Sequence, residues 1–160
     1  MGTRSRKGAA KADGAAKPAT LDMGRLESAV GFLLLRAWRD AERRFDRHFR
    51  ELKLTPPQFA TLILLELNHE ATPGELSAAL GMGHNNFVLI VDNLVGRGLI
   101  TRATCVDDRR KRRLALTDSG VALLKLAHEA ENQSELDFKR QFGTGNPEKL
   151  LALLRRIEEP

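Results

Sequence analysis

Apolar residues recur at helical spacing in long segments toward both ends of the chain. Residues 23–52 place them on one broad face, at Leu26, Val30, Leu33, Leu34, Ala37, Ala41, Phe45, Phe49 and Leu52. A second long pattern begins at Thr117, breaks at Gly143-Thr144-Gly145, and is followed by a last amphipathic helix that starts at Asn146-Pro147. The first face is wider than one packing partner would cover, so we expect it to pack against another subunit.

The middle of the chain predicts a helix-turn-helix. Thr55-Pro56-Pro57 begins a helix that ends near Asn68, and Thr72 with Glu75 forms a capping box at the start of the next one. Two short helices, 73–80 and 84–97, are then joined by Gly81-Met82-Gly83. This spacing is typical of DNA-binding modules in which the second helix enters the major groove.

A basic hairpin is predicted after Gly98. Two strand patterns, Leu99 to Val106 and Leu114 to Leu116, flank the run Asp108-Arg109-Arg110-Lys111-Arg112-Arg113. Arginines at a hairpin tip make a positive finger that can follow a phosphate backbone or enter a narrow minor groove. The predicted fold is therefore mainly α with a small two-stranded β-wing.

We expect three parts in this winged helix-turn-helix. Residues 1–20 are predicted to be a disordered basic tail, interpreted as a leader without a role of its own. Residues 21–54 and 118–160 are predicted to be dimerisation helices, and residues 55–117 to be the DNA-binding lobe. A chain of 160 residues fits one such domain with an oligomerisation element.

The net charge of +5 is unevenly distributed. Residues 1–20 hold five basic side chains against one acidic, and residues 107–113 hold five against two, so the rest of the chain is slightly acidic. Positive charge concentrated in these two segments indicates a partner that is anionic and is contacted there. Nucleic acid is the first candidate.

Other classes of function find little support in the sequence. The four histidines are scattered without ligand spacing, so we expect no metal, and no arrangement of nucleophile, base and acid indicates an enzyme. Gly81-Met82-Gly83 lacks the third glycine of a nucleotide-binding loop, and no cofactor is expected. Cys105 is interpreted as an inert strand residue. A single cysteine, with no membrane-spanning or secretory segment, leads us to expect a cytoplasmic protein.

Four ordered motifs resemble the MarR family of bacterial winged helix-turn-helix regulators. They are Leu54-Thr55-Pro56-Pro57-Gln58-Phe59, then Glu75 to Gly81, then Val91-Asp92-Asn93-Leu94 with Gly98-Leu99-Ile100, and the wing signature at Asp108-Arg109-Arg110 and Leu116-Thr117. The resemblance covers roughly residues 25 to 158. It implies a homodimer with interlocking first and last helices, which reads a pseudo-palindrome. Many such regulators are repressors released by a small, often aromatic or anionic, ligand.

The recognition helix departs from the family pattern. Many members carry Ser or Thr and Arg where this chain has Val88 and Leu89. We therefore expect the residues at the start of helix 84–97 to read the bases. The apolar side chains of Val88 and Leu89 could touch a thymine methyl. Arg110 is expected in the minor groove, oriented by Asp108. The full set of expected DNA contacts is His84, Asn85, Asn86, Val88, Leu89, Ser77, Arg97, Arg102, Asp108, Arg109, Arg110 and Arg112.

An effector pocket is the second candidate site. Arginines interleave with aromatic and apolar residues on the first helix, where an aromatic acid or its acyl thioester could bind. The candidate residues are Phe32, Leu35, Arg36, Trp38, Arg39, Arg43 and Phe45. The alternative is a charged outer face in which the arginines pair with neighbouring acids.

The sequence thus predicts a homodimeric, ligand-responsive repressor that binds double-stranded DNA. Two other functions stay open. The apolar run Phe87 to Val91 would also fit a small-molecule binding protein that kept the helix-turn-helix shape without reading DNA. The basic tail would also fit a nonspecific DNA binder.

Overall fold

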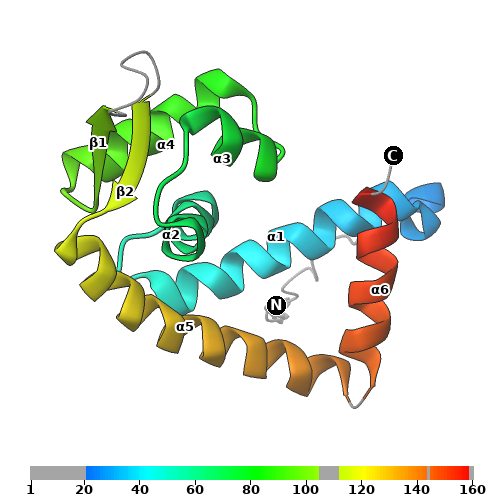
Figure 1. The fold of residues 1–160 in the computed structure, drawn as a ribbon. Coiled ribbons are helices and arrows are strands. Elements are labelled where there is room, and N and C mark those ends of the chain that lie inside the picture. Colours follow the sequence, from blue (N-terminus) through cyan, green and yellow to red (C-terminus); the bar gives the residue numbers. More distant parts are fainter. Residues whose placement is uncertain (1–20, 105–111, 144, 159–160) are drawn as a thin grey trace, which may run out of the picture. The chain divides into compact units, whose positions relative to one another are not determined.

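The computed structural model describes residues 21–104, 112–143 and 145–158. A 3₁₀ turn η1 (Gly24–Ser28) precedes a run of helices interrupted by one hairpin (Figure 1). The elements are α1 (Val30–Phe49), α2 (Pro56–Asn68), α3 (Pro73–Ala79), α4 (His84–Gly96), β1 (Ile100–Thr104), β2 (Arg112–Leu116), α5 (Asp118–Phe142) and α6 (Asn146–Glu158). The predicted architecture, mainly helical with a two-stranded wing, is confirmed for these residues.

The prediction of one unbroken helix over residues 23–52 was wrong. Gly24 has φ +49°, and its amide donates to Asp22 Oδ1 at 2.9 Å, which begins a 3₁₀ turn. Ala29 is then extended, with ψ 114°, before α1 starts. Apolar spacing does not distinguish a 3₁₀ turn followed by an α-helix from one long α-helix, because both can keep the same residues on one side.

The chain divides into two compact units at Arg36. Of the first unit, the structure describes η1 and the first turns of α1. Its large apolar side chains are mostly exposed, with Val30 at 69% and Leu35 at 52%. The second unit begins at Ala37 and contains all the packing described below.

The core of the second unit lies under the helix-turn-helix. Its members come from α1 to α5, the sheet and three connecting segments. Each is less than a tenth exposed: Phe49, Leu54, Phe59, Leu62, Leu65, Ala71, Leu76, Phe87, Val91, Leu94, Leu99, Ile100, Leu114, Leu124 and Ala127. Phe49 joins the end of α1 to this core. The centroid of its ring lies 3.7 Å from the ring centroid of Phe45 and 4.8 Å from that of Phe59. Thus α1 and the DNA-binding lobe share one hydrophobic core.

The wing is an antiparallel pair in which Ile100 faces Leu116 and Thr104 faces Arg112. On its other side, Leu114 exchanges two main-chain hydrogen bonds with Ala71, which ties the hairpin to the segment before α3. Thr117 fastens the base of the wing to α5. Its hydroxyl donates to Gly98 O at 2.6 Å and accepts from Gly120 N at 3.0 Å.

Helix α5, of 25 residues, is the longest helix described in the second unit. The hairpin precedes its N-terminus and α6 follows its C-terminus (Figure 1). The Arg44 guanidinium lies 5.4 Å from the centre of the Phe138 ring, a cation–π contact between α1 and α5. Helix α6 exposes a set of apolar side chains: Leu150, Leu151, Leu153, Leu154 and Ile157. Within the described residues, no helix has both the length and the apolar character needed to cross a membrane.

Candidate nucleic-acid interface

The recognition helix α4 is positioned by local signals that surround α3. Thr72 N donates to Glu75 Oε2 at 2.7 Å and Glu75 N donates to Thr72 Oγ1 at 3.2 Å, which is the predicted capping box. After α3, Gly81 adopts φ +60°, a conformation that most side chains disfavour, and the chain turns into α4. Met82 N donates to Ser77 O at 2.9 Å and closes this turn.

Helix α4 has one buried and one exposed face. Phe87, Val91 and Leu94 are at most 2% exposed and face the core. The first turn of α4 is exposed at His84, Asn85 and Asn86, while Val88 is half-buried. Leu89 is 68% exposed, one turn beyond Asn85. An amide-rich helix start followed by a free apolar side chain therefore lies on the surface of the helix-turn-helix.

Three of the residues expected to contact DNA, Ser77, Arg97 and Arg102, have partners within the fold. Ser77 is 7% exposed and its hydroxyl donates to Gly74 O at 3.0 Å. Arg97 donates from Nη1 to Lys53 O at 2.7 Å and from Nη2 to Leu52 O at 2.9 Å. Arg102 forms an ion pair with Asp92. Of the three, the Arg102 side chain keeps the largest exposure, 38%.

Two polar residues of α4, Asp92 and Asn93, bind side chains of neighbouring elements. Neither was assigned a role from the sequence. Asp92 pairs with Arg102, which joins α4 to the first strand of the wing. Asn93 Oδ1 accepts a hydrogen bond from Gln58 Nε2 at 2.9 Å, which joins α4 to the start of α2. Both belong to the motif Val91-Asp92-Asn93-Leu94. Two polar residues between buried apolar ones were the signal that could have indicated this role.

The tip of the wing lies outside the described residues. This concerns Asp108, Arg109 and Arg110, so their expected contacts stay predictions. Arg112 is described through its main chain, which pairs with Thr104 in the sheet. Arg112 is therefore the first residue of β2 and lies opposite the last residue of β1.

The candidate effector residues on α1 show features of the charged outer face. Arg39 pairs with Glu42 at 3.2 Å and Arg43 pairs with Asp40 at 3.1 Å. Hydrogen bonds from Arg44 and then Arg43 hold the pKa of Asp40 below its ordinary value. Trp38 is 52% exposed.

The other expected effector residues also lie on α1. Phe45 stacks on Phe49 and belongs to the aromatic cluster under α1. Phe32 is half-buried, and Leu35 and Arg36 are exposed, in the first unit. Within the described residues, no group of three or more histidine, cysteine or acidic side chains is arranged to hold a metal ion.

Comparisons with known proteins agree with this architecture. The MarR family model matches residues 52–111. The transcriptional repressor CouR bound to a 23-mer DNA duplex is 34% identical, with a TM-score of 0.83 over 88% of this chain and 100% of that one. CouR bound to p-coumaroyl-CoA is 33% identical, with a TM-score of 0.82 over 88% and 99%.

A third solved structure is a probable transcriptional regulator from Pseudomonas aeruginosa. It is 27% identical to this chain, with a TM-score of 0.79 over 83% of this chain and 99% of that one. The likeness to CouR extends over nearly all of both chains and includes the helices outside the helix-turn-helix. The chain therefore belongs to the MarR family of winged helix-turn-helix regulators.

Proposed function

We propose that this protein is a homodimeric, ligand-responsive transcriptional repressor that binds a pseudo-palindromic operator. The observation that carries the proposal is the two-sided character of α4. Its buried face is Phe87, Val91 and Leu94, and its exposed face offers His84 to Asn86 and Leu89 to a partner. The DNA-bound structure of the 34% identical CouR supports DNA as that partner.

In this proposal, base reading belongs to the first half of α4. An asparagine amide can bond the N6 and N7 edge of adenine in two places, and Asn85 and Asn86 are the exposed asparagines of the first turn. Leu89, with Val88 beside it, has no hydrogen-bonding group, so its partner in the major groove is a thymine methyl. His84 begins the helix and can donate to a phosphate or a base edge.

The wing and its surroundings supply affinity rather than base reading. Asp108, Arg109, Arg110 and Arg112 are proposed to meet the minor groove and the adjacent phosphates. Arg102 remains a candidate for a phosphate, since its ion pair with Asp92 is on the surface and a phosphate can share the guanidinium. Ser77 and Arg97 serve the fold through their internal hydrogen bonds.

The homodimer is proposed to form through residues 21–54 and 118–160. Helix α6 exposes five large apolar side chains, an arrangement that a second copy would cover. Two recognition helices related by a dyad would then sit about 34 Å apart, one turn of DNA, which predicts a pseudo-palindrome.

The effector is proposed to be a small aromatic or anionic molecule. CouR, of which a p-coumaroyl-CoA complex is known, supports this class. Trp38, Arg39 and Arg43 present an exposed ring and two cations on α1, with Phe32, Leu35, Arg36 and Phe45 on the same helix. To lower DNA affinity a hundredfold, the effector must bind the DNA-free state better by about 2.7 kcal/mol.

Selection of bound sequences from a random pool of duplex DNA tests the proposal. A shared inverted repeat with half-sites one helical turn apart is the expected result. Enrichment without a motif would indicate a nonspecific DNA binder instead. No enrichment would indicate a small-molecule binding protein on this scaffold and would contradict the proposal.

A second selection with Asn86→Ala identifies base reading directly. The expected result is a changed preference at one position of each half-site, because a single side chain reads a single base pair. An equal loss on every sequence would show that Asn86 contacts the backbone.

A further inference from the structure

The end of α4 is bonded to neighbouring elements, whereas its exposed start carries the proposed base contacts. Asp92 pairs with Arg102 of β1, and Asn93 Oδ1 accepts a hydrogen bond from Gln58 of α2. Arg97, the C-cap of α4, donates to main-chain carbonyls between α1 and α2. Because a helix is stiff, bonds at its last turn determine where its first turn points.

Arg97 binds the turn that leads from α1 into α2. Its Nη1 donates to Lys53 O at 2.7 Å and its Nη2 donates to Leu52 O at 2.9 Å. The guanidinium is planar, so two of its nitrogens on two successive carbonyls fix a direction as well as a distance. The Arg97 side chain is half-buried, and its bond to Leu52 O is partly shielded from water.

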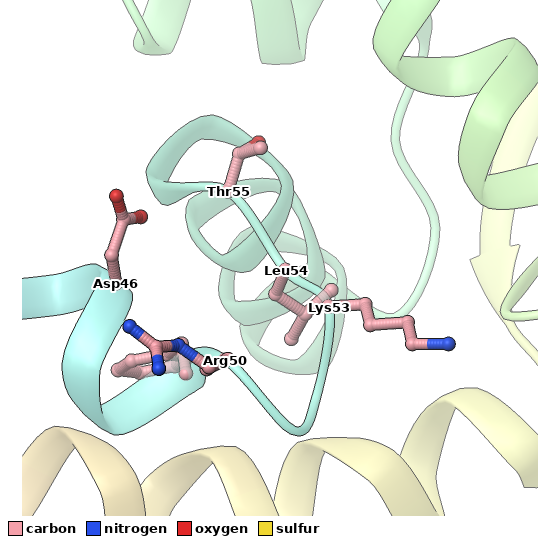
Figure 2. A pocket seen from close by; sticks show the side chains of 6 residues that line it. Asp46, Arg50, Lys53, Leu54 and Thr55 are labelled. Atoms are coloured by element: carbon pink, nitrogen blue, oxygen red, sulfur yellow. The ribbon is translucent and has the colours of Figure 1, made fainter.

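The two acceptors of Arg97 are anchored to the end of α1. Leu52 N donates to Phe49 O at 3.1 Å, which bonds the first acceptor residue to the last residue of α1. Lys53 and Leu54 follow in the connection to α2 (Figure 2). Leu54 is 5% exposed and belongs to the core. Lys53 has φ +51°, a conformation that persists only where surrounding contacts hold it, and the bond from Arg97 is such a contact.

A second link to α4 starts one helical turn before Arg97. The Gln58 side chain accepts a hydrogen bond from Thr55 N at 3.0 Å and donates to Asn93 Oδ1 at 2.9 Å. Asn93 and Arg97 are four residues apart, so they lie on the same side of α4. Contacts at two points one turn apart oppose a change in the direction of the helix.

A small change in the direction of α4 is large on the scale of DNA. The helix has 13 residues. At 1.5 Å per residue it is about 20 Å long, so a pivot of about 10° at its last turn moves its start by roughly 3.5 Å. The rise of one base pair is about 3.4 Å. The end of α1 belongs to the proposed dimerisation segment 21–54, so the bonds of Arg97 connect each recognition helix to the dimer.

We propose that Arg97 is a positioning residue that determines which separation of half-sites the dimer accepts. It acts through the carbonyls of Leu52 and Lys53, which keep α4 in a fixed direction from the end of α1. The residues at the start of α4 read the sequence of a half-site, whereas Arg97 limits the distance between the two half-sites. This inference rests on the proposed function, because such a distance exists only for a dimer that reads an inverted repeat.

Operator duplexes with one base pair inserted or removed between the half-sites test this role. Each base pair moves a half-site by about 3.4 Å and turns it by about 35°. The wild type is expected to lose at least about tenfold in affinity, because both copies of α4 no longer engage at once. For Arg97→Ala the same change is expected to cost less than about threefold, since its recognition helices can follow the half-sites. Equal losses in wild type and variant overturn the proposal.

Two further variants separate position from charge. The Lys53 side chain extends away from the end of α1 in Figure 2, so Lys53→Ala removes a cation of this turn and leaves the carbonyl that Arg97 binds. This variant is expected to keep the wild-type preference for one spacing. Arg97→Lys keeps the charge without the planar fork, so it is expected to relax the preference, and it carries the test if Arg97→Ala does not fold. A relaxed preference in Lys53→Ala, or a wild-type preference in Arg97→Lys, overturns the proposal.

The salt dependence of binding tests for a direct phosphate contact of Arg97. Each phosphate that a cation neutralises contributes about one unit to the slope of log affinity against log salt concentration. Arg97→Ala is expected to leave this slope unchanged. A slope reduced by about one unit, with the same loss of affinity at every spacing, would make Arg97 a phosphate contact and would overturn the proposal.

A distance measurement without DNA tests the same role independently. Cys105 is the single cysteine of the chain, so Asn85→Cys in a Cys105→Ser background places one nitroxide label at the start of each α4. Pulsed electron paramagnetic resonance then gives the distribution of distances between the two labels of a dimer. Arg97→Ala is expected to broaden this distribution, and Lys53→Ala to preserve it. A distribution that Arg97→Ala leaves unchanged overturns the proposal.

The two measurements separate this inference from the proposed function. A protein that binds no DNA, but whose label distances broaden in Arg97→Ala, overturns the proposed function and leaves the role of Arg97 in directing α4 standing. A protein that reads an inverted repeat with a spacing preference independent of Arg97 overturns the inference alone. A monomer gives no distance between labels and overturns both.

Discussion

The imidazole Nε2 of His48 lies 3.0 Å from Asp137 Oδ2, which joins α1 to α5 across 89 positions of the sequence. Both side chains are about a quarter exposed. Arg140 also approaches Asp137, at 3.5 Å. The hydrogen bond from His48 is the main cause that lowers the pKa of Asp137 below its ordinary value of 3.8, although burial acts in the opposite direction.

This pair predicts an acid-sensitive contact between α1 and α5. A carboxyl whose pKa is lower in the folded state stabilises the fold above its unfolded pKa, and that contribution is lost as the pH falls through the folded pKa. Asp137→Asn is therefore expected to lower the free energy of unfolding at neutral pH, and the difference from wild type should shrink below about pH 4. Urea unfolding at a series of pH values measures this difference in the free energy of unfolding.

Glu135→Gln serves as the control, because Glu135 is an exposed acid on the same helix. A difference that stays constant down to pH 3 or so would contradict the interpretation.

A second histidine gives the opposite pH dependence. His128 on α5 lies 3.0 Å from Glu66 of α2 and 3.5 Å from Glu131. Burial lowers the pKa of His128, but the hydrogen bonds to Glu66 and Glu131 together outweigh it and raise the pKa above 6.5. Stability from a raised pKa is complete below the unfolded pKa and is lost as the pH rises through the folded one.

The expected measurement for this site is a double-mutant cycle of His128→Gln and Glu66→Gln. Because His128 is 39% exposed, solvent screens the pair, and a coupling of roughly 0.5 kcal/mol is expected below pH 6.5. It should vanish in the alkaline range. A coupling that persists there would show a hydrogen bond independent of charge.

The base of the wing leaves no room for a side chain at Gly120. A Cβ at this position would lie 2.0 Å from Leu99 O and 3.3 Å from Leu116 Cδ2. Gly120→Ala must separate α5 from the chain before β1, and is expected to cost about 3 kcal/mol of unfolding free energy. Gly96→Ala is the matched control, since a Cβ there meets nothing within 4 Å, and it is expected to gain about 0.5 kcal/mol. Thermal unfolding compares the two, and similar stabilities for both variants would show that this contact relaxes freely.

Local signals in the sequence predicted the helix-turn-helix well. The capping box of Thr72 and Glu75 and the glycine at residue 81 act over three or four residues, so their chemistry determines where α3 begins and ends. Gly98, expected to follow a helix end, has φ +67° for the same reason. Periodicity alone was insufficient at residues 23–29, where Asp22 and Gly24 start a 3₁₀ turn.

Long-range partners could not be derived from spacing. Arg97 was expected to contact DNA, and nothing in the spacing indicated that its guanidinium donates to carbonyls 44 and 45 residues away. The Gln58–Asn93 contact spans 35 residues. Such pairs depend on how α1, α2 and α4 pack, and no periodic pattern within one element encodes them.

Leu89 gives the sharpest test of the recognition helix. Its side chain is 68% exposed, so Leu89→Ala is expected to change the free energy of unfolding by less than about 0.5 kcal/mol. In the DNA complex the same change removes the proposed contact with a thymine methyl, and discrimination at that base pair should fall by about 1 kcal/mol. Leu67→Ala is the matched control, because Leu67 is 70% exposed on α2 and has no proposed part in DNA binding. Binding to operator duplexes that carry thymine or uracil at each position measures the effect, since uracil lacks only the methyl group. If wild type and Leu89→Ala lose equal affinity on uracil substitution at every position, Leu89 does not read a thymine, and the base reading of α4 is confined to its first turn.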